Sequence, residues 1–141
     1  MKSWNDVKDE VRKIKPNKEI ARSLLKMAQI RLMEVKEKNI DKFASLIIED
    51  YYEIIKECIV ALMSIDGLKT LSHKVLIIYL KNFYPQFKED EIILIDMLGS
   101  LRNKIVYYGF FIEPEFVKRN EKRILKIIKK LIKLVKNKLE E

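Results

Sequence analysis

The sequence is poor in the residues that bend or cross-link a polypeptide chain. Its 141 residues include three glycines, three prolines and one cysteine. A β-sandwich or barrel needs a turn about every ten residues, so this scarcity favours helices joined by short turns. With 48% hydrophobic and 35% charged residues, the chain suits one domain, residues 1–141, that buries roughly two-thirds of its unfolded surface. Within that domain, residues 1–16 form an N-terminal segment that can be partly helical.

Long apolar runs are also absent. No segment approaches the length needed to cross a bilayer, and the N-terminus, MKSWNDVKDEVRKIK, is charged throughout and lacks the apolar stretch of a signal peptide. We therefore expect a cytoplasmic protein with no membrane partner. Abundant Lys, Glu and Ile beside scarce Gln and Cys indicate a thermophile.

The single cysteine and the single histidine limit the chemistry that the chain can perform. Cys58 cannot form an internal disulfide, and its segment ECIVALM predicts a neutral, buried thiol. His73 follows Ser72 at a predicted helix start, which indicates a capping or packing role more than a catalytic one. One histidine and one buried cysteine give no zinc-ligand spacing, so we expect neither a metal nor a cofactor.

Apolar residues recur at helical spacing in five segments. The first covers residues 18–38. Asp41 is the expected cap of a long second helix that ends at Gly67. Ser72 is the expected cap of a short third helix, which ends before Pro85. The fourth begins at the acidic residues 89–91 and the fifth covers residues 113–139. We predict an all-α fold: an antiparallel, up-and-down four-helix bundle with the short third helix as an additional connection.

The last predicted helix holds most of the net charge. From Lys118 to Glu141 there are ten Lys or Arg and three Glu, so this segment contributes +7 of the chain's +8. At 100° per residue, seven of these cations share one face: Lys118, Arg119, Lys122, Lys126, Lys129, Lys133 and Lys136. Such a face can follow a nucleic-acid backbone through its phosphates. The alternative is a solvated lysine face that keeps the protein soluble.

The stretch SLRNKIVYYGF, residues 100–110, places an arginine beside the apolar side of the fourth helix. A guanidinium at that border must keep its hydrogen bonds, so we expect Arg102 to pair with a carboxylate, for which Asp50 and Glu57 are candidates, or to bind a ligand phosphate. A separate polar stripe accompanies it along the helix, made of Asp96, Ser100, Asn103 and Tyr107. The stripe is either the lining of a cleft or an ordinary polar face.

Two stretches together resemble the HEPN superfamily of small helical-bundle proteins. They are ASLIIEDYYEIIKECIVALMSIDGLKTLSHKVLIIYL, residues 44–80, and LGSLRNKIVYYG, residues 98–109. The matching features are a long second helix that ends in glycine, a Ser-His helix start, and an Arg-Asn pair before a Tyr-Gly. The resemblance implies a homodimer with a shared cleft. In many members an arginine, four to six residues and then a histidine form a metal-independent ribonuclease site, and some are toxins beside a small nucleotidyltransferase.

The chain departs from the family pattern at the histidine. Tyr107 stands five residues after Arg102, where the histidine would fall. Metal-free RNA cleavage needs a base with a pKa near neutrality, which suits histidine, at about 6.5, better than tyrosine, at about 10. The tyrosine that the nucleotidyltransferase modifies in toxin members corresponds here to Gly109, so that regulation does not carry over.

We therefore predict a dimeric HEPN-like protein that binds RNA or nucleotide phosphates, is catalytically weak or inactive, and serves a toxin–antitoxin or defence system. One alternative is an active metal-independent ribonuclease that uses Arg102 with Tyr107 or with a displaced His73. The other is an interaction subunit whose polar stripe and basic helix dock a nucleotidyltransferase or another protein.

Overall fold

A computed structural model describes residues 2–141; residue 1 lies outside the described part. Helices account for most of these residues, so the all-α prediction is confirmed. In chain order the elements are α1 (Trp4–Val7), a 3₁₀ turn η1 (Lys8–Glu10), β1 (Arg12–Lys13), α2 (Lys18–Lys36), α3 (Ile40–Asp66), β2 (Leu68–Lys69), α4 (His73–Phe83), α5 (Glu89–Tyr108) and α6 (Pro114–Leu139). Among residues 2–141, no helix is both long and apolar enough to cross a membrane.

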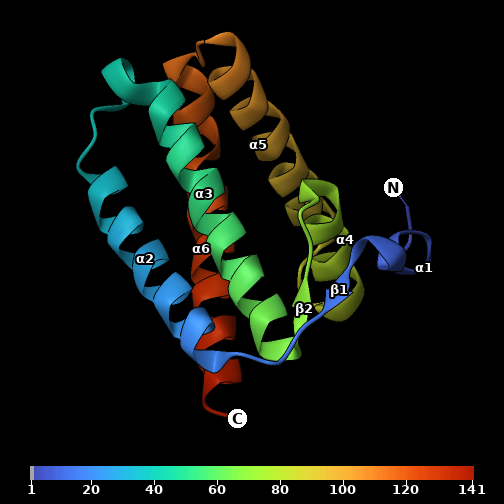
Figure 1. The fold of residues 1–141 in the computed structure, drawn as a ribbon. Helices are drawn as coiled ribbons and strands as arrows, with labels where there is room; N and C mark the ends of the chain where they lie inside the picture. The colour runs from blue at the N-terminus through green and yellow to red at the C-terminus, as the bar shows by residue number, and fades with distance from the viewer. Residues whose placement is uncertain (1) are drawn as a thin grey trace.

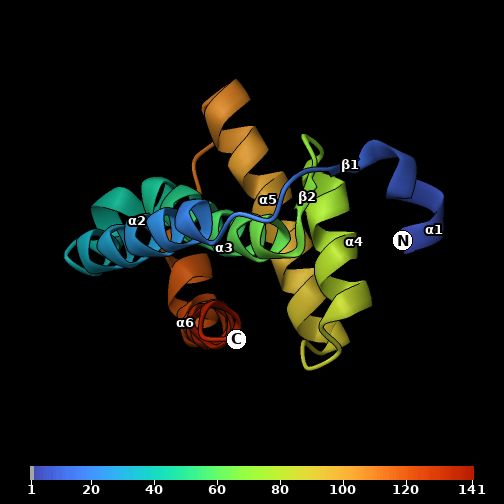
Figure 2. The same ribbon diagram turned by 60° about the horizontal axis from the view of Figure 1, so that its bottom comes forward.

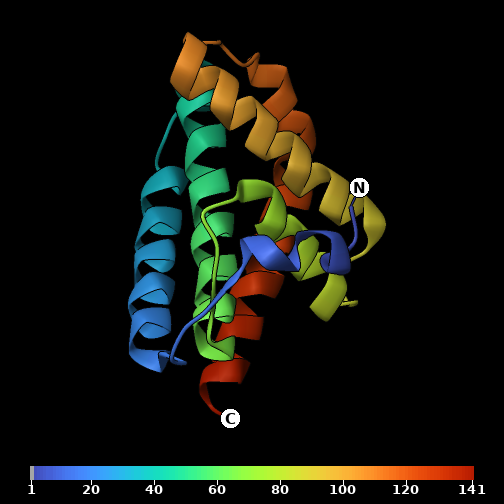
Figure 3. The same cartoon turned by 45° about the vertical axis from the view of Figure 1, so that its right-hand side comes forward.

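The longest helix, α3, lies at the centre of the molecule. Helices α2, α3 and α6 lie side by side along their lengths, and α5 leans across α3 at an incline (Figures 1 and 3). Viewed from below, α4 and α1 lie on the side of α3 opposite to α2 (Figure 2). Because α3 touches α2, α4, α5 and α6, it is apolar around much of its circumference, as a central helix must be. Its residues Ile54, Ile55 and Leu62 have no exposed surface.

The ends of α3 show one correct and one wrong prediction. Gly67 ends the helix in the left-handed conformation, with φ of 74°, as expected. At the start, however, the cap is Asn39 and not Asp41, because the Asn39 side chain accepts a hydrogen bond from the Lys42 amide at 3.0 Å. Asp41 instead lies in the first turn, where its negative charge interacts favourably with the positive end of the helix dipole.

The N-terminal segment is attached to the body by a short strand pair that the helical pattern did not predict. Strand β1 pairs antiparallel with β2, with Arg12 opposite Lys69. A side chain at Gly67 would come within 2.8 Å of the main-chain oxygen of Ile14, so only glycine leaves room for this approach. In α1, Trp4 packs against the ring of Phe83, with 5.0 Å between ring centres. The segment therefore leads to α4, beside the polar groups described below.

The remaining caps follow their sequence signals. Ser72 accepts the Val75 amide at 3.3 Å at the start of α4, and Glu91 accepts the Lys88 amide at 2.9 Å at the start of α5. Helix α6 is amphipathic: its buried residues are Val117, Ile124, Ile127, Ile128, Leu131 and Val135. The positions of α4, α5 and α6 on α3 therefore follow from buried apolar faces with well-formed ends.

Replacement of Leu62 tests whether the burial of α3 stabilises the fold. Leu62→Ala removes a side chain with no exposed surface and should lower the free energy of unfolding by about 2–5 kcal/mol. Leu71→Ala is the matched control: this leucine is 96% exposed, and its loss should change stability by less than about 0.5 kcal/mol. Urea unfolding followed by circular dichroism measures both, and equal effects would contradict the central position of α3.

Candidate functional site

Arg102 lies in the contact between α5 and α3, with about a quarter of its side chain exposed. Its Nη2 atom lies 3.0 Å from Oε1 of Glu53, whose side chain is exposed to a similar extent. Its Nη1 atom also donates to the side-chain oxygen of Asn103 at 3.3 Å. The sequence left open a carboxylate or a ligand phosphate for this arginine; the structure shows a carboxylate, that of Glu53 and not of Asp50 or Glu57. The guanidinium is therefore neutralised within the protein.

The two acids that the sequence suggested for Arg102 bind other cations. Asp50 accepts from Lys38 at 2.5 Å, which ties the end of α2 to α3. Glu57 pairs with Arg31 of α2 at 2.9 Å; burial raises the pKa of this carboxyl group, and Arg31 opposes the shift. The three acids lie within eight residues on α3, and only the tertiary structure decides which one faces α5.

Tyr52 links Arg102 to His73. The centre of the Arg102 guanidinium lies 5.9 Å from the centre of the Tyr52 ring, a distance suited to cation–π attraction. The Tyr52 hydroxyl is hydrogen-bonded to Nδ1 of His73 at the start of α4. Sequence reasoning placed His73 apart from Arg102, but both side chains contact the same tyrosine.

Gly99 explains why α5 can come so close. A methyl group at this position would lie 2.2 Å from Cε1 and 2.3 Å from Nε2 of His73, so any larger residue would push the imidazole or the helix away. Nε2 is buried and has no hydrogen-bond partner among residues 2–141. An isolated glycine inside an apolar helix pattern was the one signal in the sequence for this contact.

This environment favours a neutral His73. Burial is the main cause that lowers the pKa of its imidazole, and the positive charges of Lys74 and Arg102 act in the same direction. Asp96 opposes them, but its carboxylate is bound to Lys74 at 2.7 Å. The imidazole is thus packed between Tyr52 and Gly99 in a state that disfavours protonation.

The polar stripe of α5 divides between this cluster and the solvent. Asp96 and Asn103 make the contacts given above, whereas Ser100 is exposed. Tyr107 has 69% of its surface exposed, and five residues on a helix turn its direction by about 140° from that of Arg102. A groove of about 510 Å³ opens beside Asp96, lined also by Lys2, Val7, Glu10, Ser72, Lys74, Val75 and Ile78. Arg102 and Tyr107 therefore do not share one cleft within a single chain.

The cations of α6 fall into two groups. All seven cations of the predicted basic face are exposed, and within residues 2–141 only Lys118 of these has a carboxylate within 4.0 Å, that of Asp41 at 3.0 Å. The other three cations of the helix pair with α5 or α3. Lys130 binds Glu91 at 2.7 Å, Arg123 lies 4.0 Å from Asp90, and Lys138 lies 3.6 Å from Asp66. The paired cations hold the helix in place, and the basic face is left to the solvent.

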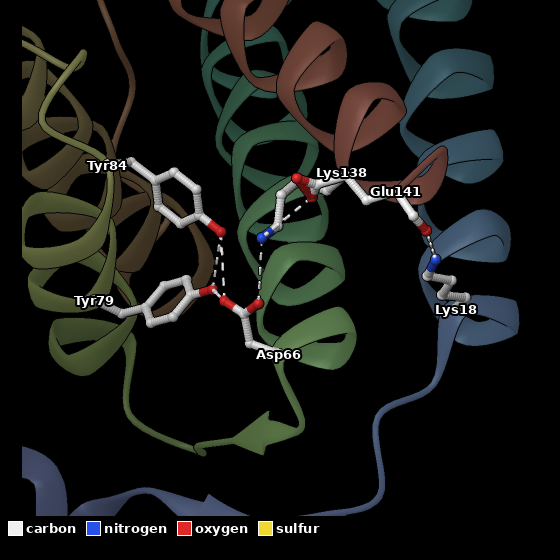
Figure 4. Close-up of polar contacts among 6 residues, drawn as sticks. All are labelled: Lys18, Asp66, Tyr79, Tyr84, Lys138 and Glu141. Carbon is white, nitrogen blue, oxygen red and sulfur yellow. Dashed lines mark hydrogen bonds and ion pairs between the residues drawn. The ribbon is translucent and has the colours of Figure 1, made fainter.

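A second polar cluster joins the ends of α3, α4 and α6 (Figure 4). Tyr79 donates to the Asp66 carboxylate at 2.5 Å, and Tyr84 donates to the same oxygen at 3.4 Å. Burial and the nearby carboxylate raise the pKa of the Tyr79 hydroxyl. Lys138 completes the cluster, and Lys18 donates to the main-chain oxygen of Glu141. These contacts fasten the C-terminal end of α6, and no sequence pattern indicated them.

Cys58 lies in the core of α3 with no exposed surface. Burial, aided by the charge of Glu57, raises the pKa of its thiol to about 12, so the thiol stays protonated and poorly nucleophilic. Within residues 2–141, no group of three or more His, Cys, Asp or Glu side chains is placed to hold a metal ion.

No protein-family model matches this chain, and neither does any curated protein sequence or solved structure.

The lowered pKa of His73 predicts a specific dependence of stability on pH. The unfolded imidazole binds a proton near pH 6.5, whereas the folded one binds it only at lower pH. The stability that comes from neutral His73 should be fully present above about pH 6.5 and decrease as the pH falls through that value toward the folded pKa. The free-energy difference between wild type and His73→Gln, measured by urea unfolding from pH 8 to pH 5, should therefore shrink on acidification.

Comparing wild type with His73→Gln at each pH isolates the contribution of His73, because the other titrating groups are common to both proteins. A difference that stays constant with pH, or that grows as the pH falls, would contradict the packed neutral imidazole.

Proposed function

We propose that this protein binds RNA along the basic face of α6 and does not cleave it. The observation that carries the proposal is that six of the seven cations of this face, all except Lys118, have no ion pair within residues 2–141. Lys118 and Lys136 are eighteen residues apart, which corresponds to about 27 Å along a helix. The face can thus meet several successive phosphates, and binding releases counterions from the RNA.

Three features of the Arg102 cluster support an inactive centre. Glu53 pairs with Nη2 of Arg102, although the Nε atom of this arginine is buried without a hydrogen-bond partner among residues 2–141. His73, the only histidine, has one ring nitrogen bonded to Tyr52 and the other packed on Gly99. Tyr107 is directed into solvent, away from Arg102. Among residues 2–141, these three side chains therefore provide no base for a 2′-hydroxyl proton beside a cation that is free to hold the phosphate.

The HEPN-like assignment depends on the resemblance of residues 44–80 and 98–109. On that basis we propose that α2, α3, α5 and α6 form the up-and-down antiparallel bundle of that superfamily and that two copies pair through the polar stripe of α5. In the same proposal the protein acts in the cytoplasm as part of a toxin–antitoxin or defence system, with a small nucleotidyltransferase as its protein partner.

A ribonuclease that uses His73 is the second candidate. The observation that favours it is the Tyr52 ring, which contacts both His73 and Arg102. Cleavage would require α4 and α5 to separate enough to free the imidazole from Gly99 and the arginine from Glu53. Among catalytic schemes for this chain, His73 with Arg102 fits the geometry better than Tyr107 with Arg102.

The salt dependence of RNA binding tests the α6 face. For single strands, log affinity should fall with log salt by about 0.7 units per phosphate contact. Changing Lys122, Lys126 and Lys129 to glutamine should flatten that slope by about two units and weaken binding to all sequences alike. Fluorescence anisotropy with labelled RNA across a salt series gives both quantities.

The matched control removes the same charge elsewhere. Lys8, Lys13 and Lys69 are exposed and lie outside α6, so their triple change to glutamine should leave the slope close to that of wild type. No binding at low salt, or equal slopes for the two triple variants, would reject the α6 face as the RNA site.

The proposed lack of cleavage has its own test. Purified protein incubated with a mixed RNA substrate in a metal chelator should leave the RNA intact over hours, as the Arg102→Ala variant should. Cleavage that is lost in Arg102→Ala would overturn the proposal. In that event His73→Gln and Tyr107→Phe would show which residue acts as the base, since only replacement of the catalytic residue should abolish the activity.

A further inference from the structure

Four aromatic residues follow one another closely where α5 ends. Of the residues from Tyr107 to Phe111, Tyr108 and Phe111 are the most exposed, each with 84% of its surface in solvent. Exposed apolar residues are ordinary when they occur singly, but a contiguous group on a small protein usually marks a binding surface.

The backbone that carries these rings is held on both sides. Gly109 turns the chain with φ of 61°, and its amide donates to the Ile105 carbonyl at 3.1 Å. Three residues later, Ile112 is buried and its amide donates to the side chain of Ser45 on α3 at 2.7 Å. The rings of Tyr108 and Phe111 are thus presented by a fixed turn, which lowers the entropy lost when a ligand packs on them.

The surroundings of these rings favour an anion-bearing partner. Lys104 lies one helical turn before Tyr108, and its Nζ atom is 5.7 Å from the centre of the Phe110 ring. It has no carboxylate within 4.0 Å among residues 2–141. Helix α6 starts at Pro114, three residues after Phe111 (Figures 1 and 3), and the first cation of its basic face is Lys118, which follows Glu113 and Glu115 in the chain.

We propose that Tyr108 and Phe111 form a stacking platform for unpaired RNA bases, while the backbone of the same strand follows the basic face of α6. This inference rests on the proposed function and specifies its ligand as single-stranded. Proteins that bind single strands combine a cationic track with exposed aromatic rings in this way, because every base offers a flat apolar face. The proposed pairing of two copies uses the polar stripe of α5 and leaves Tyr108 and Phe111 to the RNA. A second copy fits these two rings less well, since it would bring the Lys104 side chains of two basic chains together.

The experiment compares single-alanine variants on three probes by fluorescence anisotropy or competition. The probes are a labelled adenine-rich single strand, an RNA duplex of the same length, and inorganic polyphosphate as a competitor without bases. Tyr108→Ala and Phe111→Ala should each weaken single-strand binding at least about five-fold. Neither variant should change the slope of log affinity against log salt or the inhibition constant of polyphosphate, which has no bases to stack. The duplex should bind wild type more weakly than the single strand does.

Two control variants distinguish the loss of base stacking from the general effect of removing an exposed side chain or of misfolding. Tyr108→Phe keeps the ring and should keep the affinity of wild type. Leu71→Ala removes an exposed apolar side chain, 96% exposed, from the segment before α4 and should have no effect. Light scattering should give the same molar mass for all variants.

Each contrary outcome has a distinct meaning. If the α6 lysine variant loses affinity but both aromatic variants bind the single strand as wild type does, the platform is rejected and the proposed function stands. If the aromatic variants change the molar mass and not the RNA affinity, the rings form an interface between copies and the platform is rejected. If wild type binds none of the probes, the platform and the proposed function fail together.

Discussion

The close approach of α5 to α3 and α4 at Gly99 governs the chemistry around Arg102. Because Gly99 has no side chain, the ring of His73 fits against α5, and Tyr52 can bond to that ring and lie beneath Arg102 one turn later. Glu53, the next residue on α3, then reaches the guanidinium at 3.0 Å. A partly buried cation is stabilised by a nearby carboxylate, so the same approach that gathers these groups also pairs the arginine with Glu53.

Most of the positive charge of helix α6, unlike that of Arg102, is not paired with an acid among residues 2–141. Its inward and lateral cations are bound by acids from neighbouring helices, as Lys130 is by Glu91, and they serve to dock the helix. Its outward cations are exposed, and within residues 2–141 all of them except Lys118 have no carboxylate within 4.0 Å. Like charges along one face repel one another, which costs stability unless solvent ions or a ligand screen them. A polyanion relieves this repulsion, whereas a neutral ligand does not.

Sequence reasoning located elements better than contacts, for identifiable reasons. Gly67 and Ser72 have local roles that depend only on their immediate neighbours, so their positions as caps were predictable. Asn39 and Asp41 are both good caps two residues apart, and the selection of Asn39 depends on how the chain enters α3. Glu53 could not be distinguished from nearby acids because the facing direction of α3 toward α5 is a tertiary property. The strands β1 and β2 are only two residues each, too short for an alternating pattern to be recognised.

The pairing of Arg102 also decides where a phosphate can bind. A phosphate that approached Arg102 would also approach Glu53, and at an effective dielectric constant of about 20 each unit charge about 4 Å away contributes about 4 kcal/mol. Attraction by the arginine and repulsion by the glutamate are then of similar size and nearly cancel. Within residues 2–141, only Lys118 of the basic face has carboxylates within 4.0 Å, those of Asp41 and Glu115. In the function proposed above, the RNA backbone would therefore bind along α6 and not at Arg102, so the cations proposed to bind RNA lie apart from the Arg102 cluster.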